Sequence, residues 1–191
     1  GGRRAMIVAD VEFTAQPTLG RLWSPSEWLE QHLSKLQGSS ALDLGCGTGR
    51  NAALLASLGY SVLAVDNLPS ALEKTRSLVE RYANASVETQ LLEYPHGLSE
   101  LKERRFDVVL SLMAYHEELP EALFELVNPG GVWLIEAYSR EHGHNTGKPK
   151  DLALTLPIDT LEEALKPFSI KEFSVVKTPE SERVCVFTQK G

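Results

Sequence analysis

The chain contains little cysteine: two residues, Cys46 and Cys185, among 191. They lie far apart in the sequence, and their neighbours do not have the spacing of a metal-binding cluster. Neither is expected to form half of a disulfide, so the sequence favours a reducing compartment and a cytoplasmic protein. The first residues, Gly-Gly-Arg-Arg-Ala, lack an initiator Met, which is consistent with a cloning remnant or a cut from a longer chain.

Long apolar runs and an excess of basic residues are also missing. No apolar run approaches the roughly 20 residues that span a bilayer, and no signal peptide is visible, so no membrane partner is expected. The chain has 19 Lys and Arg residues and 26 Asp and Glu residues, which gives a net charge of −7. A nucleic-acid partner is disfavoured because a protein that binds nucleic acid usually has a basic surface, although a local basic patch is compatible with an acidic protein.

Segments with strand and helix patterns alternate along most of the chain. A length of 191 residues with 42% hydrophobic content suits one domain with a sizeable core. Residues 1–20 are expected to form an irregular arm or linker, and residues 21–191 the domain. In the first helix, Ser24 is the expected N-cap and Pro25 the first helical residue. Strands are predicted over about 40–45, 61–66, 87–91, 106–112, 132–138, 169–177 and 183–189, and further helices over about 49–58, 69–83, 120–127 and 160–168.

This alternation predicts an α/β fold with a doubly wound, mostly parallel sheet and helices on both faces. The last two strands have a short connection, which predicts an antiparallel edge with a reversed last strand. In such sheets the ligand lies beyond the carboxyl ends of the strands.

The most informative segment runs from Ala41 to Arg50, with the sequence Ala-Leu-Asp-Leu-Gly-Cys-Gly-Thr-Gly-Arg. It predicts a buried strand, a glycine loop and the start of a helix with free N–H groups. A second apolar run ends in Asp66, 21 residues after Gly45, where an acid suits the two ribose hydroxyls. Together these features predict a cofactor that contains a nucleoside.

The third glycine of the dinucleotide fingerprint is replaced by Arg50. The segment Asp-Leu-Gly-Cys-Gly-Thr-Gly instead resembles the first motif of class I S-adenosylmethionine-dependent methyltransferases. The resemblance covers about residues 22–191 and implies a seven-stranded Rossmann-like sheet with the last strand reversed. It implies that S-adenosylmethionine is the cofactor, with Asp66 on its ribose and Asp43 near its amino-acid part. The loop residues implied to pack against it are Gly45, Cys46, Gly47 and Gly49.

The same resemblance extends to the adenine side and the N-terminal arm. It implies that an acidic or polar residue at the end of the third strand contacts the adenine amino group. Glu93 is the candidate, although some relatives have the acid at the position of Leu92. Asn67 and Leu68 are expected to flank the adenine. Trp23 is expected either to cover the cofactor or to anchor the core.

The segment after the 106–112 strand is expected to pass beside the reactive methyl group. Leu112 or Met113 is expected to pack against the cofactor, and Tyr115 and His116 to face the acceptor. His116 is a candidate general base because its unperturbed pKa lies near neutrality. An ordinary helix-start or surface histidine is the alternative. Methyl transfer to a soft nucleophile depends mostly on position and desolvation, so no strong catalytic residue is required.

The segment from Tyr138 to Pro157 is predicted to be an unusually long loop. Its two histidines, His142 and His144, give too few ligands to predict a metal site. One interpretation is an acceptor lid with a cationic lining for an anionic substrate, and the other is a solvated loop. The cationic candidates in this segment are His142, His144, Lys148 and Lys150.

Several segments look like small bacterial-type methyltransferases related to tellurite-resistance enzymes, some of which are attached to a rhodanese-like domain. They are Thr-Leu-Gly-Arg-Leu-Trp-Ser-Pro from Thr18, Gly-Arg-Asn from Gly49, Val-Asp-Asn-Leu-Pro from Val65, and Gly-Lys-Pro-Lys-Asp from Gly147. In those relatives an Arg tends to stand where this chain has Met113 or Ala114, which puts a shared substrate in doubt.

The expected function is therefore methyl transfer from S-adenosylmethionine to a small-molecule nucleophile, such as a thiol or a chalcogen compound. One alternative is a module that binds the cofactor without turnover. Another is a methyltransferase that acts on RNA or protein with a partner. A nicotinamide-dependent oxidoreductase is disfavoured by Arg50.

Overall fold

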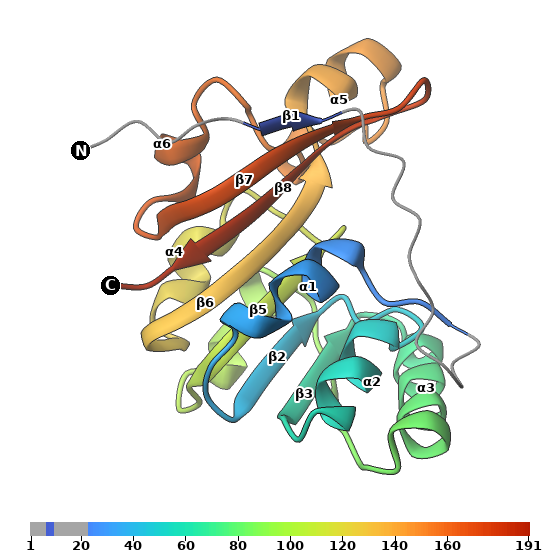
Figure 1. The fold of residues 1–191 in the computed structure, drawn as a ribbon. Coiled ribbons are helices and arrows are strands. Elements are labelled where there is room, and N and C mark those ends of the chain that lie inside the picture. The colour runs from blue at the N-terminus through green and yellow to red at the C-terminus, as the bar shows by residue number, and fades with distance from the viewer. Residues whose placement is uncertain (1–6, 10–22) are drawn as a thin grey trace.

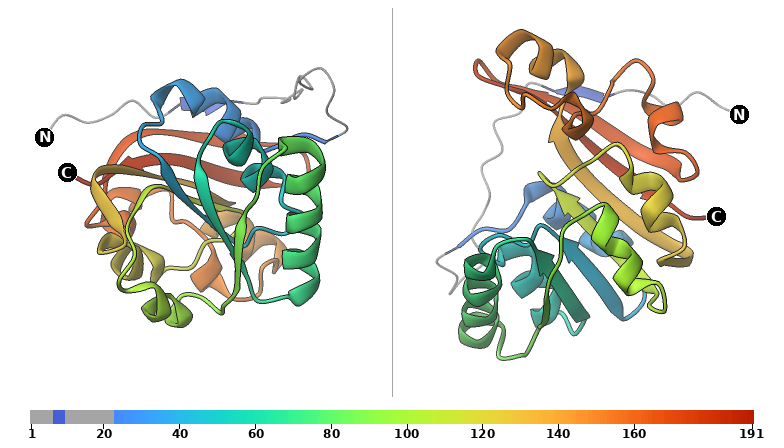
Figure 2. Two further views of the ribbon diagram at one scale, coloured as in Figure 1. Left: turned by 90° about the horizontal axis from the view of Figure 1, so that it is seen from below. Right: turned by 180° about the vertical axis from the view of Figure 1, so that it is seen from behind.

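The computed structural model describes residues 7–9 and 23–191, which form one eight-stranded sheet with helices on both faces (Figures 1 and 2). The strands are β1 (Ile7–Ala9), β2 (Ser40–Leu44), β3 (Ser61–Asp66), β4 (Glu88–Leu91), β5 (Phe106–Leu112), β6 (Val127–Tyr138), β7 (Ser169–Lys177) and β8 (Glu182–Gln189). The α-helices are α1 (Glu27–His32), α2 (Arg50–Ser57), α3 (Pro69–Leu78), α4 (Leu119–Phe124), α5 (Arg140–Thr146) and α6 (Leu161–Leu165). Shorter helical turns are η1 (Leu33–Lys35), η2 (Val79–Ala83), η3 (His96–Leu101) and η4 (Leu152–Leu154).

The strand order is β1-β7-β8-β6-β5-β2-β3-β4. Only β8 runs against its neighbours β6 and β7, and every other described pair is parallel. This confirms the predicted doubly wound sheet with a reversed last strand. The strand order reverses between β2 and β5, so their carboxyl ends are where a ligand is expected.

Two hydrophobic layers hold the helices to the sheet. On one face the strands pack against α1, α2 and α3, and the Ala- and Leu-rich stretch 52–56 of α2 is buried in the layer. On the other face they pack against η3, α4 and α6 around Trp133 and Phe106. Because parallel strands are covered on both sides, β2 and β5 are buried along most of their length.

Several local expectations differ from the structure. Strand β6 begins at Val127 rather than at about 132, and the helix predicted over about 120–127 ends at Phe124. The first helix is capped by Ser26, whose hydroxyl accepts from the N–H of Leu29, and Pro25 lies outside it. The arm is not irregular throughout, because residues 7–9 form β1 and extend the sheet beside β7. The 138–157 segment is not a plain loop, because it contains α5 and η4.

Tertiary contacts and caps explain two of these differences. The backbone N–H of Ser26 donates to the amide oxygen of Asn51 in α2 at 2.8 Å, so packing against α2 selects the later cap. Helix α5 is capped by Ser139 and stopped by Gly147 in the left-handed conformation. Within the described residues, no helix combines the length and the apolar character needed to cross a bilayer.

Asp107 in β5 connects the amino ends of β2 and β5. Its carboxylate accepts hydrogen bonds from the backbone N–H groups of Ser39 and Ser40, the Ser40 hydroxyl and the Asn128 amide. Desolvation alone would raise the pKa of Asp107, but these donors, led by Ser39, outweigh it and lower the pKa.

We expect Asp107→Asn to lower the free energy of unfolding by about 1 kcal/mol at pH 7, because the partly exposed carboxylate loses charge-assisted hydrogen bonds. A lowered folded-state pKa stabilises the protein above the unfolded-state pKa, and this contribution disappears as the pH falls through the folded-state pKa. Urea denaturation at pH 7 and pH 3 should show the difference from wild type shrinking in acid. Asp159→Asn, at an exposed position, is the control and should show no such pH dependence.

Candidate functional site

The glycine loop joins β2 to α2 and bends around the end of β3. The backbone N–H groups of Gly45 and Cys46 both donate to the carbonyl of Val65, at 2.9 and 3.0 Å. Gly45, Gly47 and Gly49 all have positive φ, between 56° and 88°. A side chain is strained in that region, which explains why the loop needs glycine.

Two of these glycines also lie where a side chain would collide. A Cβ on Gly49 would come within 2.6 Å of the Cα of Thr75 in α3. A Cβ on Gly45 would meet Ala114 and the Tyr94 hydroxyl at 2.7 and 2.8 Å. At Gly47 the nearest atom would be 4.0 Å away, so this part of the loop has open space on its Cβ side.

Asp66, the last residue of β3, binds the glycine loop directly. One carboxylate oxygen accepts from the N–H of Gly47 at 3.0 Å, and the other from the N–H of Leu68 at 3.1 Å. The side chain is buried but keeps 8% exposure, which leaves it reachable from the carboxyl edge of the sheet. This is the position that the sequence predicted for the ribose acid.

Asp43 lies on the neighbouring strand β2 and is buried, with 2% exposure. Its Oδ2 atom is buried and has no hydrogen-bond partner within the described part of the chain. Burial, reinforced by the charge of Asp66 and opposed by the Ala52 N–H, raises the pKa of Asp43 to about 7. An unpartnered, buried carboxylate oxygen fits a cationic donor such as the ammonium group of a bound amino acid.

Cys46 serves the loop as a small buried residue. The Thr75 hydroxyl lies 3.3 Å from both the Cys46 sulfur and the Gly47 carbonyl oxygen, so it links α3 to the loop. Desolvation raises the pKa of the Cys46 thiol to about 12, which keeps it protonated and unreactive.

The residues predicted to flank the adenine have different environments. Asn67 and Leu68 are exposed immediately after Asp66, and Glu93 is an exposed carboxylate after β4. Leu92 points into the core with 2% exposure, while its backbone N–H donates to the Asp66 carbonyl at 3.0 Å. Leu92 can therefore offer a ligand its backbone but not its side chain.

The two residues predicted to face the methyl acceptor, Tyr115 and His116, have different environments. Tyr115 is 4% exposed and stacks on Trp133 at 6.4 Å between ring centroids. The Nδ1 atom of His116 accepts the Glu118 backbone N–H at 3.0 Å, so the neutral ring carries its proton on Nε2. In this arrangement His116 has no free acceptor nitrogen for a substrate proton. Leu112 is half-buried at the end of β5, beside Glu136 of β6.

Trp23 is partly buried against the helical layer, with its ring edge-on to Tyr82 at 6.0 Å. It lines a hollow of about 600 Å³ that also includes Thr48 of the glycine loop and Arg50. Trp23 therefore lies near the glycine loop and also packs with the core, and its contact with the cofactor stays a prediction.

Sequence reasoning missed Tyr94, which follows Glu93. Its hydroxyl lies beside Gly45, and its ring packs on the core. Burial raises the pKa of Tyr94 to about 12, with the charges of Asp66 and Asp43 adding to the effect. Thr75 and Ala114, which contact the loop from α3 and the segment after β5, were missed as well. No sequence motif marks these residues, because only folding brings them to the loop.

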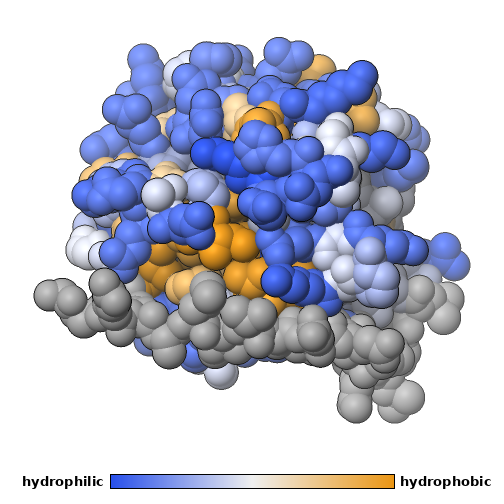
Figure 3. Space-filling model, turned by 90° about the horizontal axis from the view of Figure 1, so that it is seen from above, coloured by the Kyte–Doolittle hydropathy of each residue, from blue (hydrophilic) through white to orange (hydrophobic). Residues whose placement is uncertain are grey.

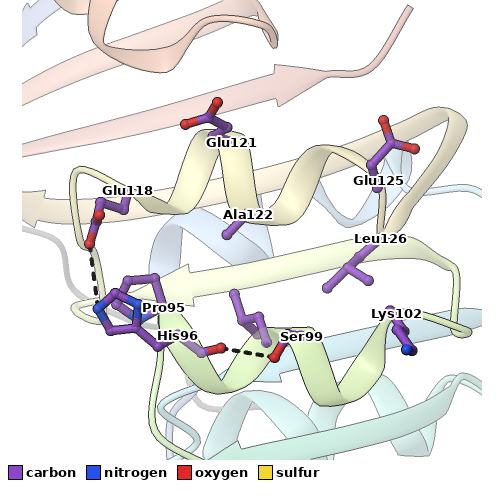
Figure 4. Close-up of a pocket in the computed structure, with 10 residues that line it drawn as sticks. Pro95, His96, Ser99, Lys102, Glu118, Glu121, Ala122, Glu125 and Leu126 are labelled. Atoms are coloured by element: carbon purple, nitrogen blue, oxygen red, sulfur yellow. Dashed lines mark hydrogen bonds and ion pairs between the residues drawn. The ribbon is translucent and has the colours of Figure 1, made fainter.

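A separate groove of about 390 Å³ lies between η3 and α4 (Figure 4). Glu118, Glu121 and Glu125 border it on the α4 side, and His96 and Lys102 on the η3 side. It contains no residue of the glycine loop and neither Asp43 nor Asp66. It is therefore not part of the site described above.

A doubly wound sheet with a reversed last strand, a three-glycine loop after one central strand and an acid after the next defines a class I methyltransferase fold. Residues 41–131 match a family model described as "Methyltransferase domain". Residues 41–131 thus match this family, and the fold of the chain is that of class I S-adenosylmethionine-dependent methyltransferases.

Relatives and solved structures agree with this family. The chain is similar to a ubiquinone biosynthesis O-methyltransferase of Leptothrix cholodnii, with 31% identity over 59% of this chain and 50% of that protein. It is 36% identical to the mitochondrial enzyme of that name from Schizosaccharomyces pombe, over 54% and 39% of the two chains. The chain therefore spans half or less of these relatives' length.

Among solved structures, TehB from Haemophilus influenzae superposes with a TM-score of 0.69 at 22% identity, over 88% of this chain and 63% of that one. The N-methyltransferase NodS from Bradyrhizobium japonicum, in complex with S-adenosyl-L-homocysteine, superposes with a TM-score of 0.68 at 14% identity. That match covers 86% of this chain and 84% of NodS. These matches show the fold.

We expect Gly49→Ala to lower the free energy of unfolding by about 3 kcal/mol, because it adds a collision with Thr75 to the strain of a positive φ. Gly59→Ala is the matched control. Gly59 has φ +95° at the other end of α2, and its added Cβ would meet nothing within 4 Å. It should cost about 1 kcal/mol. Equal losses in urea denaturation would contradict the close approach of loop and helix.

The raised pKa of Asp43 predicts a pH dependence of the ligand-free protein. A raised folded-state pKa contributes stability that is complete below the unfolded-state value of 3.8 and is lost as the pH rises through about 7. We expect Asp43→Asn, a neutral substitute of similar shape, to be more stable than wild type at pH 8 by about 2–4 kcal/mol and to differ little at pH 4. Parallel stability curves for the two proteins from pH 4 to pH 8 would contradict the assignment.

Proposed function

We propose that this chain transfers the methyl group of S-adenosylmethionine to a small-molecule nucleophile. The observation that carries the proposal is the pairing of two buried carboxylates at the carboxyl edge, one bound to the glycine loop and one with an unpartnered oxygen. The match to the methyltransferase family supports the identity of the cofactor.

The residues divide the binding task by their position and charge. Asp66 would accept hydrogen bonds from the ribose hydroxyls, and the open side of Gly47 would allow close approach of the cofactor to the loop. Asp43 would accept from the ammonium group, whose positive charge would favour the ionised carboxylate. Asn67, Leu68 and Glu93 would border the adenine together with the backbone of Leu92.

When bound, S-adenosylmethionine supplies an electrophilic methyl group on a positively charged sulfur. The chain's part is to hold that group in line with the acceptor and to exclude water from it. The Nδ1 atom of His116 already accepts a hydrogen bond from a backbone N–H. The site therefore suits a methyl acceptor that arrives deprotonated or needs no base. A small-molecule acceptor is supported by the acidic composition, which disfavours an RNA substrate.

We expect Asp66→Asn to weaken binding of S-adenosylmethionine and S-adenosylhomocysteine by about 10- to 100-fold, because a charged acceptor is lost at the ribose position. Isothermal titration calorimetry measures the affinities, with the exposed Asp159→Asn as the control. An acceptor screen that follows S-adenosylhomocysteine formation with thiols, chalcogen oxyanions and amines then tests turnover. Failure of the wild-type protein to bind either ligand would refute the proposal, and binding without turnover would identify a cofactor-binding module.

A further inference from the structure

Large apolar side chains are exposed mainly at the end of the sheet where the site lies. Figure 3 shows the face seen from above in Figure 1, where β1, β7 and α5 lie, with an apolar area near the middle of that face. Among the described residues, Leu68 follows β3, Leu91 ends β4 and Met113 follows β5, with exposures of 57%, 56% and 44%. Leu154 in η4 is 40% exposed. Leu58, at the far end of α2, is the remaining large exposed hydrophobic residue among those that the structure describes.

These side chains fall into two groups. Leu68 and Leu91 border Asp66, since Leu91 pairs with Asp66 across the sheet and Leu68 donates its N–H to the Asp66 carboxylate. They lie where the proposed nucleoside would bind. Met113 and Leu154 lie on the other side of β5, on two segments joined by a 2.8 Å hydrogen bond from the Glu117 N–H to the Ala153 carbonyl. This second group, Met113 and Leu154, is therefore available to contact the methyl acceptor.

Met113 is held in a backbone conformation that disfavours its side chain. Its φ is +62°, and its N–H donates to the Glu136 carbonyl at 2.7 Å. A non-glycine residue in this region costs on the order of 1 kcal/mol or more, and such strain clusters at functional sites. Glycine would relieve the strain, so the apolar side chain at this position is kept against a local preference.

Two cations near these segments, Arg140 and Arg183, already have anionic partners. The Arg140 guanidinium lies 3.9 Å from the Glu117 carboxylate and also contacts Thr155. Arg183 pairs with Glu136 at 3.1 Å. Neither guanidinium is free to balance the charge of an oxyanion, whereas Met113 and Leu154 offer apolar contact.

We propose that Met113 and Leu154 form the acceptor-contacting surface and select an apolar organic thiol over a chalcogen oxyanion. This inference rests on the proposed methyl transfer. The thiol loses its proton to water and arrives as the thiolate, so no protein base is needed. The thiolate sulfur forms a bond to the methyl carbon, the bond from that carbon to the sulfonium sulfur breaks, and its electron pair stays on that sulfur. The products are a methyl thioether and S-adenosylhomocysteine.

The test compares 4-nitrothiophenol, sodium selenite and sodium tellurite as separate acceptors and measures S-adenosylhomocysteine formation. We expect turnover of the thiol at least about tenfold above either oxyanion. Leu154→Ala should raise KM for the thiol by about fivefold, because less apolar area is buried on binding. Leu58→Ala, equally apolar and exposed on the far side, should leave KM unchanged. Met113→Gly should also raise KM while leaving the free energy of unfolding equal to or above that of wild type.

The affinity for S-adenosylmethionine, measured by calorimetry in each variant, separates the two proposals. Unchanged affinity with a selective rise in KM supports the acceptor surface. With cofactor binding intact, three results would overturn this inference and leave the cofactor assignment standing. They are preferred turnover of selenite or tellurite, no turnover of the thiol, and equal KM for Leu154→Ala and Leu58→Ala. Absent cofactor binding in the wild-type protein refutes both.

Discussion

The contact between the Asp66 carboxylate and the backbone N–H of Gly47 joins the two chain segments from which the site is built. The glycine loop leaves β2, and Asp66 ends β3, so this one interaction sets the height of the loop above the strand ends. Helix α3 can approach the loop closely at Gly49 because glycine has no side chain there, and Thr75 occupies the space that one would fill. Strand, loop and helix are therefore mutually dependent, and a substitution in any of them shifts the others.

The same arrangement creates an electrostatic tension. Asp43 and Asp66 face the same edge of the sheet, and the more deeply buried Asp43 responds with a pKa of about 7. Asp66 has two backbone N–H donors, while one oxygen of Asp43 has no partner in the described residues. Ligand-free, the fold carries a cost that a cationic ligand would relieve. Burial of a carboxylate beside another carboxylate thus lowers the stability of the ligand-free protein and favours binding of a cationic ligand.

Much of this fold could be predicted because its signals are local. Ser61–Asp66 and Phe106–Leu112 are strands at the predicted bounds, since each is a short apolar run between polar residues. Helix α5 was missed although its signals, Ser139 at the start and Gly147 at the end, are present in the sequence. Gly143 within it lowers the helix propensity, and its reason is tertiary: a Cβ there would lie 2.8 Å from Leu152. Strand β1 was missed because three residues carry too little pattern, and its partner β7 lies more than 150 residues away.

The amino-acid sequence by itself determined the class of the domain, the glycine loop and the two acids, because glycine spacing and the strand-loop-helix pattern are properties of contiguous residues. Only the tertiary structure decided the roles of side chains that come together from distant segments. It placed Tyr94, Thr75 and Ala114 against the loop, turned Tyr115 into the core beside Trp133, and occupied the acceptor nitrogen of His116. The physical reason is that burial and hydrogen bonding depend on neighbours in space, and a sequence lists only neighbours along the chain.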